Sequence, residues 1–250
     1  MSFDVSADAY GQFMGQYSAL LAGRFADLAG VRSGQRALDV GCGPGALTAE
    51  LAGRLGAEAV CAVEPSASFA AAVRTLLPGV DVRVSAAEKL PFPDGGFDIA
   101  AAQLVVQFMA DPVAGLREMG RVARPGGIVA ACVWDHSRGP LATFWRGAGE
   151  LDPAAADESD RAGARDGQLA SLFGQAGLTG AKATELTVGV RHATFERWWE
   201  RFTLGVGPSG AYLESLLPER RDALRERCRL LLPAGPVEVS ATAWALACRA

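Results

Sequence analysis

Three glycines follow a short apolar segment near residue 40, and this combination is suited to holding a nucleotide-like ligand. The apolar segment 36–40 runs into Gly41, Gly43 and Gly45, and helical spacing of apolar residues begins directly afterwards. Glycine adopts backbone angles that are closed to other residues, and it lets main-chain N–H groups at a helix start approach a ligand. The segment therefore predicts a ligand cradle between a strand and a helix.

An acidic residue, Glu64, closes the next apolar segment at 59–63. Doubly wound folds place a carboxylate about 20 residues past the glycine-rich turn, where it accepts hydrogen bonds from the hydroxyls of a ribose. Glu64 occupies that place along the chain and is predicted to bind a sugar.

Strand and helix signals alternate along the first half of the chain. A helical pattern over about 7–29 precedes the glycine segment, and short apolar segments then alternate with amphipathic ones, separated by Gly and Pro. This order is typical of a parallel sheet covered by helices. The predicted strands are 36–40, 59–63, 80–84, 97–102 and 127–134, and the predicted helices are 46–55, 66–76 and 112–123.

The pattern changes after Trp134. A polar, alanine-rich connection over 135–166 leads to a helix near 168–176, and two late strands are predicted at 181–190 and 237–248. The residues between the late strands carry helical signals, so these strands do not form a tight hairpin. We expect residues 192–234 to form an inserted helical cap whose aromatic residues roof a pocket; they are Trp198, Trp199, Phe202 and Tyr212. The alternative for Trp198 and Trp199 is that they belong to the core.

Composition restricts the classes of partner. The chain has 250 residues, of which 50% are hydrophobic and 21% are charged, as in ordinary folded domains. The formal net charge of -4, without a basic block, argues against nucleic acid as a partner. Arginines are dense at 220–229, where acidic residues are interleaved, and this predicts a solvated helix face with ion pairs four residues apart.

The sequence shows neither a targeting signal nor a metal-binding motif. The first residues show no basic cluster followed by an apolar core, and no run of about 18 apolar residues occurs in the sequence. We therefore expect a cytoplasmic protein without a membrane partner. The five cysteines form no CxxC pair, and the two histidines, His136 and His192, lack a spacing suited to zinc, so no metal site is expected. His192 is expected at the surface, at a strand end.

These segments together resemble the class I S-adenosylmethionine-dependent methyltransferases, and among them the small-molecule group called methyltransferase domain 11. Beside the glycine turn and Glu64, the resemblance is carried by the motifs at 85–92, 96–98 and 118–127. It implies an α/β fold with a Rossmann-like, seven-stranded, mostly parallel sheet, an antiparallel last strand and helices on both faces. The expected organisation is a single domain over 1–250, with an N-terminal lid helix at 1–30, a cofactor-binding core at 36–134 and the cap at 192–234.

The resemblance also implies the cofactor S-adenosyl-L-methionine and assigns residues to its parts. Gly41 and Gly43 would pack against the methionine portion, with Asp39 near the ammonium group. Glu64 would bind both ribose hydroxyls, which suits a carboxylate with two acceptor oxygens. Pro65 would lie against the adenine.

The adenine and methyl ends of the cofactor are assigned by the same resemblance. Related proteins commonly hold the adenine amino group with an acid where this chain has Ala86, so adenine recognition is assigned to the backbone of Ala87 and to Glu88. Gln103, at the end of a strand, would line the methionine and methyl pocket, where a cationic sulfonium requires acceptors rather than more positive charge. On the first helix Tyr17 is preferred to Tyr10 as a contact; the alternative is that both tyrosines simply pack the helix onto the sheet.

The expected reaction is in-line displacement of the methyl group by a nucleophile of a small-molecule acceptor. The cofactor supplies the reactivity, and the protein supplies alignment and exclusion of water. His136 follows a strand end and could act as a general base, with an ordinary exposed loop histidine as the alternative. Two other functions fit parts of the pattern: an NAD(P)-dependent oxidoreductase, and a non-catalytic regulatory protein that binds S-adenosylmethionine. The sequence does not predict an oligomeric state.

Overall fold

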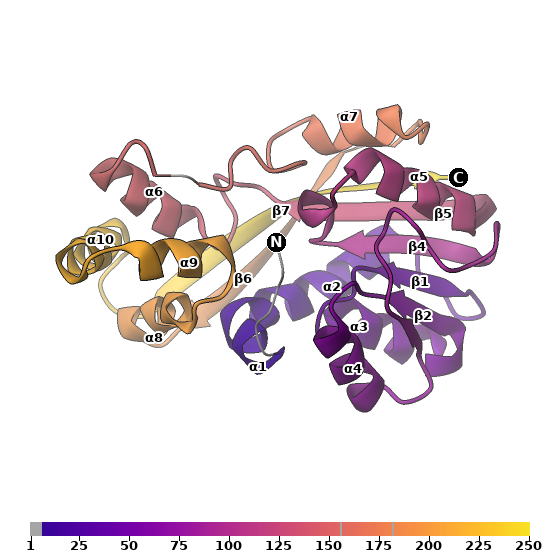
Figure 1. The fold of residues 1–250 in the computed structure, drawn as a ribbon, viewed down its shortest axis with the longest axis horizontal. Coiled ribbons are helices and arrows are strands. Elements are labelled where there is room, and N and C mark those ends of the chain that lie inside the picture. The colour runs from indigo at the N-terminus through magenta and orange to yellow at the C-terminus, as the bar shows by residue number, and fades with distance from the viewer. Residues whose placement is uncertain (1–6, 156, 182) are drawn as a thin grey trace.

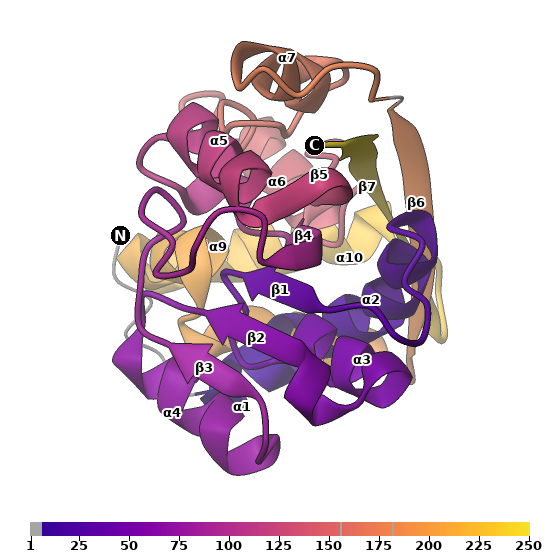
Figure 2. The same cartoon turned by 90° about the vertical axis from the view of Figure 1, so that its right-hand side faces the viewer.

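The computed structural model describes residues 7–155, 157–181 and 183–250, which form a seven-stranded sheet covered by helices (Figure 1). The strands are β1 (Ala37–Val40), β2 (Val60–Val63), β3 (Asp81–Arg83), β4 (Phe97–Gln103), β5 (Ala123–Trp134), β6 (Thr184–His192) and β7 (Val237–Arg249). Their order across the sheet is β3-β2-β1-β4-β5-β7-β6 (Figure 2). The first five strands pair in parallel, and β7 is antiparallel to both of its neighbours. The predicted fold class is confirmed.

Helices cover both faces of the sheet. On one face lie α2 (Gln16–Leu28), α3 (Ala46–Leu55) and α4 (Ala67–Leu76), and on the other lie α5 (Pro112–Val122) and α7 (Gln168–Gln175) (Figure 1). Each face of the sheet has its own hydrophobic core, and alternate residues of a strand point into opposite cores. On β1, Ala37 belongs to one core, and Leu38 and Val40 belong to the other. All four β1 residues are buried, as is usual for a parallel strand covered on both faces, and all but Asp39 are apolar.

The N-terminal helical segment predicted over 7–29 is present but is not uniform. It consists of α1 (Ala7–Tyr10), the π-helical turn η1 (Gly11–Gly15) and α2. The wider turn of η1 lies between two helical segments in the manner of the π-bulges that often occur at functional sites. The first six residues of the predicted lid lie outside the described residues.

One element was missed in the sequence, and another begins earlier than predicted. The connection over 135–166 contains a helix, α6 (Ala142–Leu151), whose buried face includes Phe144, Trp145 and Ala148; glycine and polar residues obscured this pattern in the sequence. Strand β5 begins four residues earlier than predicted, because the Pro-Gly-Gly turn forms an irregularity inside the strand. The β4–β5 register accordingly shifts between Phe97 and Ile99.

The remaining helical segments bear out the helical character predicted for 192–234. They are α8 (Phe195–Glu200), η4 (Arg201–Leu204), α9 (Gly207–Ser215) and α10 (Pro218–Leu231), and two further short turns, η2 (Ala57–Ala59) and η3 (Val106–Phe108), belong to the core region. β5 pairs with β7 from Ala243 onward, whereas residues 237–241 of β7 pair with β6. The β6–β7 ribbon thus extends past β5 and carries these helices, together with α6, at one end of the molecule (Figure 1).

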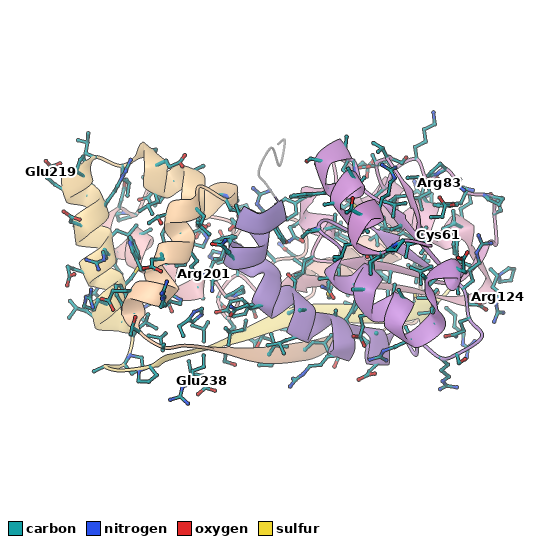
Figure 3. The ribbon with its side chains drawn as sticks, turned by 90° about the horizontal axis from the view of Figure 1, so that it is seen from below. Cys61, Arg83, Arg124, Arg201, Glu219 and Glu238 are labelled. Carbon is teal, nitrogen blue, oxygen red and sulfur yellow. The ribbon has the colours of Figure 1, made fainter. Side chains whose placement is uncertain are left out.

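Phe202 lies at the centre of the aromatic packing in the cap. Its ring stacks on Phe144 of α6 at 4.5 Å between centroids and meets Trp198 at 4.9 Å and Phe13 of η1 at 6.1 Å. The preceding residue, Arg201, lies between the cap and the N-terminal helices (Figure 3) and covers the Tyr17 ring at 4.7 Å. These contacts join the cap to the N-terminal segment.

The arginine-rich segment 220–229 is part of α10, and its ion pairs differ from the predicted spacing. Arg229 pairs with Glu226 three residues earlier and with Glu196 of α8 at 3.0 Å. Arg227 pairs with Glu150 of α6. The pairs therefore connect helices of the cap as well as residues within α10.

The described residues form neither a disulfide bond nor a membrane-crossing helix. All five cysteines are free and buried. Among the residues with a described structure, no helix combines the length and the apolar character needed to cross a bilayer.

Replacing Gly210 of α9 with Ala is expected to destabilise the cap. An added Cβ would lie 2.5 Å from the backbone C atom of Gly205 and 2.8 Å from its Cα atom, so the backbone must shift. We expect a loss of about 1–3 kcal/mol, typical of overpacking, measured by urea unfolding. Gly149→Ala in α6 is the control, because a Cβ there has no described atom within 4 Å. Equal stability of the two variants would contradict the packing argument.

Candidate functional site

A cavity of about 580 Å³ lies at the carboxyl ends of β1, β2 and β4. The strands that follow β1 lie first on one side of it, as β2 and β3, and then on the other, as β4 and β5. Doubly wound folds bind ligands at the strand ends where the order reverses in this way. The structure brings most of the predicted cofactor-binding residues to this cavity: Asp39, Gly41, Gly43, Glu64, Pro65, Ala87, Glu88 and Gln103 all line it.

The Glu64 carboxylate joins the two loops that form the base of this cavity. The N–H groups of Gly43 and Ser66 donate to its two oxygens, at 2.9 and 3.0 Å. Burial raises the pKa of Glu64, and the two N–H donors oppose part of that rise. Each carboxylate oxygen can accept more than one hydrogen bond, so the side chain retains capacity for ligand hydroxyls.

Gly41 and Gly43 serve the glycine turn in different ways. Gly41 has φ +73°, and a Cβ there would lie 2.3 Å from Cγ2 of Val105, so a side chain is excluded by neighbouring atoms. Gly43 has φ +51°, and no described atom would lie within 4 Å of its Cβ. Glycine at 41 therefore permits close packing of the turn against the segment after β4. At Gly43, by contrast, the space beside the backbone is open.

Asp39 is a buried acid with one unsatisfied oxygen. Its Oδ2 accepts a hydrogen bond from the Thr48 hydroxyl at 2.6 Å, while Oδ1 is buried and has no hydrogen-bond partner within the described chain. Burial raises the pKa of Asp39 to about 7, and the nearby Glu64 adds to the rise. A cation placed at Oδ1 would stabilise the ionised form.

The far end of the cavity contains the segments assigned to adenine. Ala86 lies here together with Ala87 and Glu88, and Glu88 accepts the Asp111 N–H at 3.0 Å. Phe69 of α4 also lines the cavity and meets the Tyr10 ring edge-on at 5.9 Å. The apolar side of this region is thus partly aromatic. No motif in the sequence had indicated Phe69 as a cavity residue.

The carboxyl end of β4 contributes unpaired acceptors. The Gln103 side-chain N–H donates to the Ser18 carbonyl at 3.0 Å, whereas its Oε1 is buried and lacks a partner among residues whose structure is described. The same holds for Oε1 of Gln107. Between them, Leu104 has φ +62°, the one positive value found for a described non-glycine residue. Such a backbone conformation costs roughly 1–3 kcal/mol and is typical of functional sites.

A second, smaller cavity of about 90 Å³ adjoins the first. Its wall comes from the N-terminal helical segment, the end of β5, α6, the loop before α7 and the cap. Five residues line both cavities: Tyr10, Leu104, Gln107, Phe108 and Arg161. The two spaces are therefore neighbours across a shared wall, as expected for a cofactor site beside an acceptor site.

His136 lines the smaller cavity and is not an ordinary exposed loop residue. Its side chain is 20% exposed, and its Nε2 lies 3.1 Å from the Asp157 carboxylate. The preceding residue, Asp135, is buried and accepts hydrogen bonds from the Ser137 N–H and from Arg138, both at 2.8 Å. These bonds fix the loop after β5 on which His136 stands.

Tyr17 lies outside the residues that line the two cavities, in contrast to its predicted role. Its hydroxyl is 3.0 Å from Nε2 of His192, and the side chain is almost completely buried. Tyr10 lines both cavities instead, and burial raises its pKa to about 12. His192 is half-buried, not a surface residue as predicted, and burial together with Arg201 lowers its pKa to about 4.

The predicted cap segment reaches the smaller cavity, but through residues other than its aromatic ones, and the burial of Trp198 and Trp199 agrees with their alternative role in the core. Trp198 and Phe202 are fully buried in the core, and the cap residues at the smaller cavity are Val206, Gly207 and Pro208. The aromatic wall of this cavity comes from other elements: Tyr10, Phe13, Phe108, Trp134 and Trp145. The residues surveyed in 7–155, 157–181 and 183–250 include no group of three or more His, Cys, Asp or Glu side chains placed to hold a metal ion.

Comparisons with known proteins agree with this arrangement. The family model described as "Methyltransferase domain" matches residues 38–131. A ubiquinone/menaquinone biosynthesis C-methyltransferase of Cupriavidus metallidurans is 32% identical over 181 residues, which cover 65% of this chain and 74% of the relative. An uncharacterized methyltransferase of Schizosaccharomyces pombe is 35% identical over 123 residues, which cover 42% and 44% of the two chains.

A solved structure extends the likeness to nearly the whole fold. The YcgJ protein of Bacillus subtilis superposes with a TM-score of 0.58 at 18% identity, covering 93% of this chain and 97% of the other. At this identity the likeness concerns the fold alone. The chain spans about half the length, or less, of the first curated relatives it matches.

Asp39→Asn is expected to flatten the pH dependence of stability in the ligand-free protein. The unfolded chain has an ordinary aspartate pKa of about 3.9, whereas burial raises the folded pKa of Asp39 to about 7. The folded state therefore binds more protons between these values, and the free energy of unfolding falls as pH rises through this window.

Urea unfolding at several pH values between 4 and 8 measures this effect, with the exposed Asp27→Asn on α2 as the control. The pKa of Glu64 is also raised, so part of the slope should persist in the Asp39 variant. An unchanged slope in Asp39→Asn would contradict the buried-acid argument.

Proposed function

Because this chain belongs to the class I S-adenosylmethionine-dependent methyltransferase family, we propose that it transfers a methyl group from S-adenosylmethionine to a small-molecule acceptor. The observation that carries the proposal is the pair of adjoining cavities, the larger of which contains Glu64 and the glycine turn. The cofactor would occupy the larger cavity, and the nucleophile of the acceptor would enter the smaller one. The reaction is direct displacement at the methyl carbon, with the sulfur as leaving group.

The methionine part of the cofactor would lie over the glycine turn. Gly41 and Gly43 leave the backbone accessible there, and Asp39 offers an unpaired carboxylate oxygen. A bound ammonium group would favour the ionised form of Asp39 and release a proton where the pKa is near 7. We therefore assign Asp39 as the counter-charge of the methionine ammonium.

Glu64 would bind the ribose. Its carboxylate is fixed by the N–H groups of Gly43 and Ser66 and therefore needs little rearrangement to accept the two hydroxyls. Pro65, directly after it, would contact the adenine, with the backbone of Ala87 and the Glu88 side chain at the polar edge. Phe69 adds an aromatic surface beside them.

The sulfonium would lie at the boundary between the cavities. The unpaired oxygens of Gln103 and Gln107 supply acceptors there, and Tyr10 supplies an aromatic face. Both features suit a cation. We assign Tyr10 to this contact in place of Tyr17, which packs against His192 and Arg201.

The apolar, largely aromatic wall of the smaller cavity favours an apolar acceptor. A volume of about 90 Å³ is suited to the reacting end of a molecule rather than to a complete large substrate. The Cupriavidus relative is named for C-methylation in quinone biosynthesis, and a flat ring of that general kind would be compatible with this wall.

Glu64→Ala is expected to weaken binding of S-adenosylhomocysteine by about 100-fold or more, because hydrogen bonds to a charged group contribute about 1.5–3 kcal/mol each. Calorimetry measures the affinity, and Glu58→Ala in η2, outside both cavities, is the control. A sharper comparison uses adenosine and 2′,3′-dideoxyadenosine. The wild type should prefer adenosine, and Glu64→Ala should lose this preference; retained preference would contradict the ribose assignment.

Methyl transfer itself is tested with isotopically labelled cofactor and a broad set of small-molecule acceptors. Mass spectrometry should detect one labelled methyl group on a product. Binding of the cofactor without transfer to any acceptor would favour the non-catalytic alternative. The oxidoreductase alternative predicts instead that NADH raises the melting temperature, since a ligand that binds the native state stabilises it.

A further inference from the structure

His136 and Asp157 form a pair at the wall of the smaller cavity. Nε2 of His136 lies 3.1 Å from Oδ2 of Asp157. The His136 backbone N–H donates to the Ala164 carbonyl at 3.0 Å, so the residue is held at both backbone and side chain. With Nε2 facing the carboxylate, Nδ1 is the ring nitrogen left for a molecule in the cavity that His136 lines.

Asp157 is itself fixed. Its Oδ1 accepts the Ser159 N–H at 2.9 Å, so its two oxygens have separate partners. Burial alone would raise the pKa of Asp157, but the hydrogen bonds from Ser159 and the nearby His136 lower it below its usual value. An ionised carboxylate can only accept hydrogen bonds. A neutral His136 beside it therefore carries its proton on Nε2 and a lone pair on Nδ1.

Two further charged side chains at this wall, Glu158 and Arg161, pair with each other. Glu158 and Arg161 line the same cavity, with Nε of Arg161 3.3 Å from Oε1 of Glu158. The indole N–H of Trp145 donates to the other Glu158 oxygen at 3.2 Å. Glu158 is thereby engaged by two neighbours, and Asp157 is the carboxylate that pairs with the imidazole.

We propose that Asp157 is a positioning residue that holds His136 as the catalytic base for the acceptor, an inference that rests on the proposed methyl transfer. Nδ1 of His136 would take the proton of an acceptor hydroxyl as an electron pair of the acceptor forms the bond to the methyl carbon. The bond between that carbon and sulfur breaks, its electrons pass to sulfur, and neutral S-adenosylhomocysteine leaves. The imidazolium formed beside Asp157 is stabilised by the carboxylate and later returns its proton to water.

This arrangement indicates the chemical class of the acceptor. A base is required where the nucleophile must lose a proton near neutral pH, as a phenolic or enolic hydroxyl does, and contributes about 10²–10⁴-fold to the rate. Carboxylates and thioethers carry a free electron pair without such a loss. We infer an acceptor with a hydroxyl on an aromatic or enolic group, methylated on that oxygen or on a carbon conjugated to it.

The imidazole tautomer can be measured without knowing the acceptor. The chain has two histidines, so long-range ¹H–¹⁵N spectra of labelled protein at neutral pH contain two imidazole patterns, and His192→Gln assigns them. We expect the neutral form of His136 to be a single tautomer with its proton on Nε2. Asp157→Asn should convert it to a mixture of tautomers, because an amide can donate or accept.

Asp160→Asn is the matched control, since this acid lies in the same loop, is 96% exposed and pairs with Arg165. It should leave the His136 pattern unchanged. A neutral His136 with its proton on Nδ1, or an unaltered tautomer in Asp157→Asn, would each overturn the proposal. Calorimetry with S-adenosylhomocysteine on the same samples tests the proposed function separately from the His136–Asp157 pair. Absent binding would contradict the proposed function, whereas the tautomer of His136 tests only the pair.

The acceptor class is tested with methyl-¹³C-labelled cofactor and a small-molecule extract. An O-methyl ether or a methyl group on a conjugated carbon is expected, formed about 100-fold more slowly by His136→Ala. Asp157→Asn should lower kcat with little change in KM, because the imidazolium that forms as the acceptor reacts loses its carboxylate partner. A methyl ester, a thioether-derived sulfonium or a quaternary ammonium product would overturn the assignment.

Discussion

The Glu64 carboxylate fixes the two loops on which the larger cavity depends. It accepts N–H groups from Gly43, after β1, and from Ser66, before α4. The carbonyl of Val63 adds a second link, because it accepts the N–H groups of Gly41 and Cys42. A buried charge is costly unless such donors surround it. The same donors also orient the carboxylate, so the structural role of Glu64 prepares the geometry proposed for ribose binding.

Two buried acids at one cavity make the ligand-free site electrostatically unfavourable. The pKa values of Asp39 and Glu64 are both raised, chiefly by burial, and Glu64 adds to the shift at Asp39. The unpaired oxygens of Asp39, Gln103 and Gln107 extend this surplus of acceptors along the cavity. A ligand with a cation and several donors would relieve all of these groups together. The proposed cofactor has both a cationic group and several hydrogen-bond donors.

Local sequence patterns were sufficient for the features that depend on local structure. Alternating apolar segments predicted the parallel strands, and the glycine turn with Glu64 predicted the cavity edge, because each depends on residues close in sequence. Features created by tertiary packing were missed. The unusual φ of Leu104, the position of Tyr10 at both cavities and the burial of His192 are not encoded in a local pattern. Asp157 carried no motif, and its pairing with His136 depends on the folded loop.

The two cavities are lined by different parts of the chain. The residues proposed to bind the methyl donor therefore differ from those proposed to select the acceptor. Most residues of the larger cavity lie within 38–131, the part that matches the family model. The smaller cavity takes His136, Trp145, Glu158 and Val206 from beyond that part, and Tyr10 and Phe13 from before it. The β6–β7 ribbon carries the cap helices at the end of the molecule where α6 also lies (Figure 1). Under the proposed function, changes in the loop after β5 or in the cap would therefore alter acceptor choice, while Glu64 and the glycine turn would continue to hold the same donor.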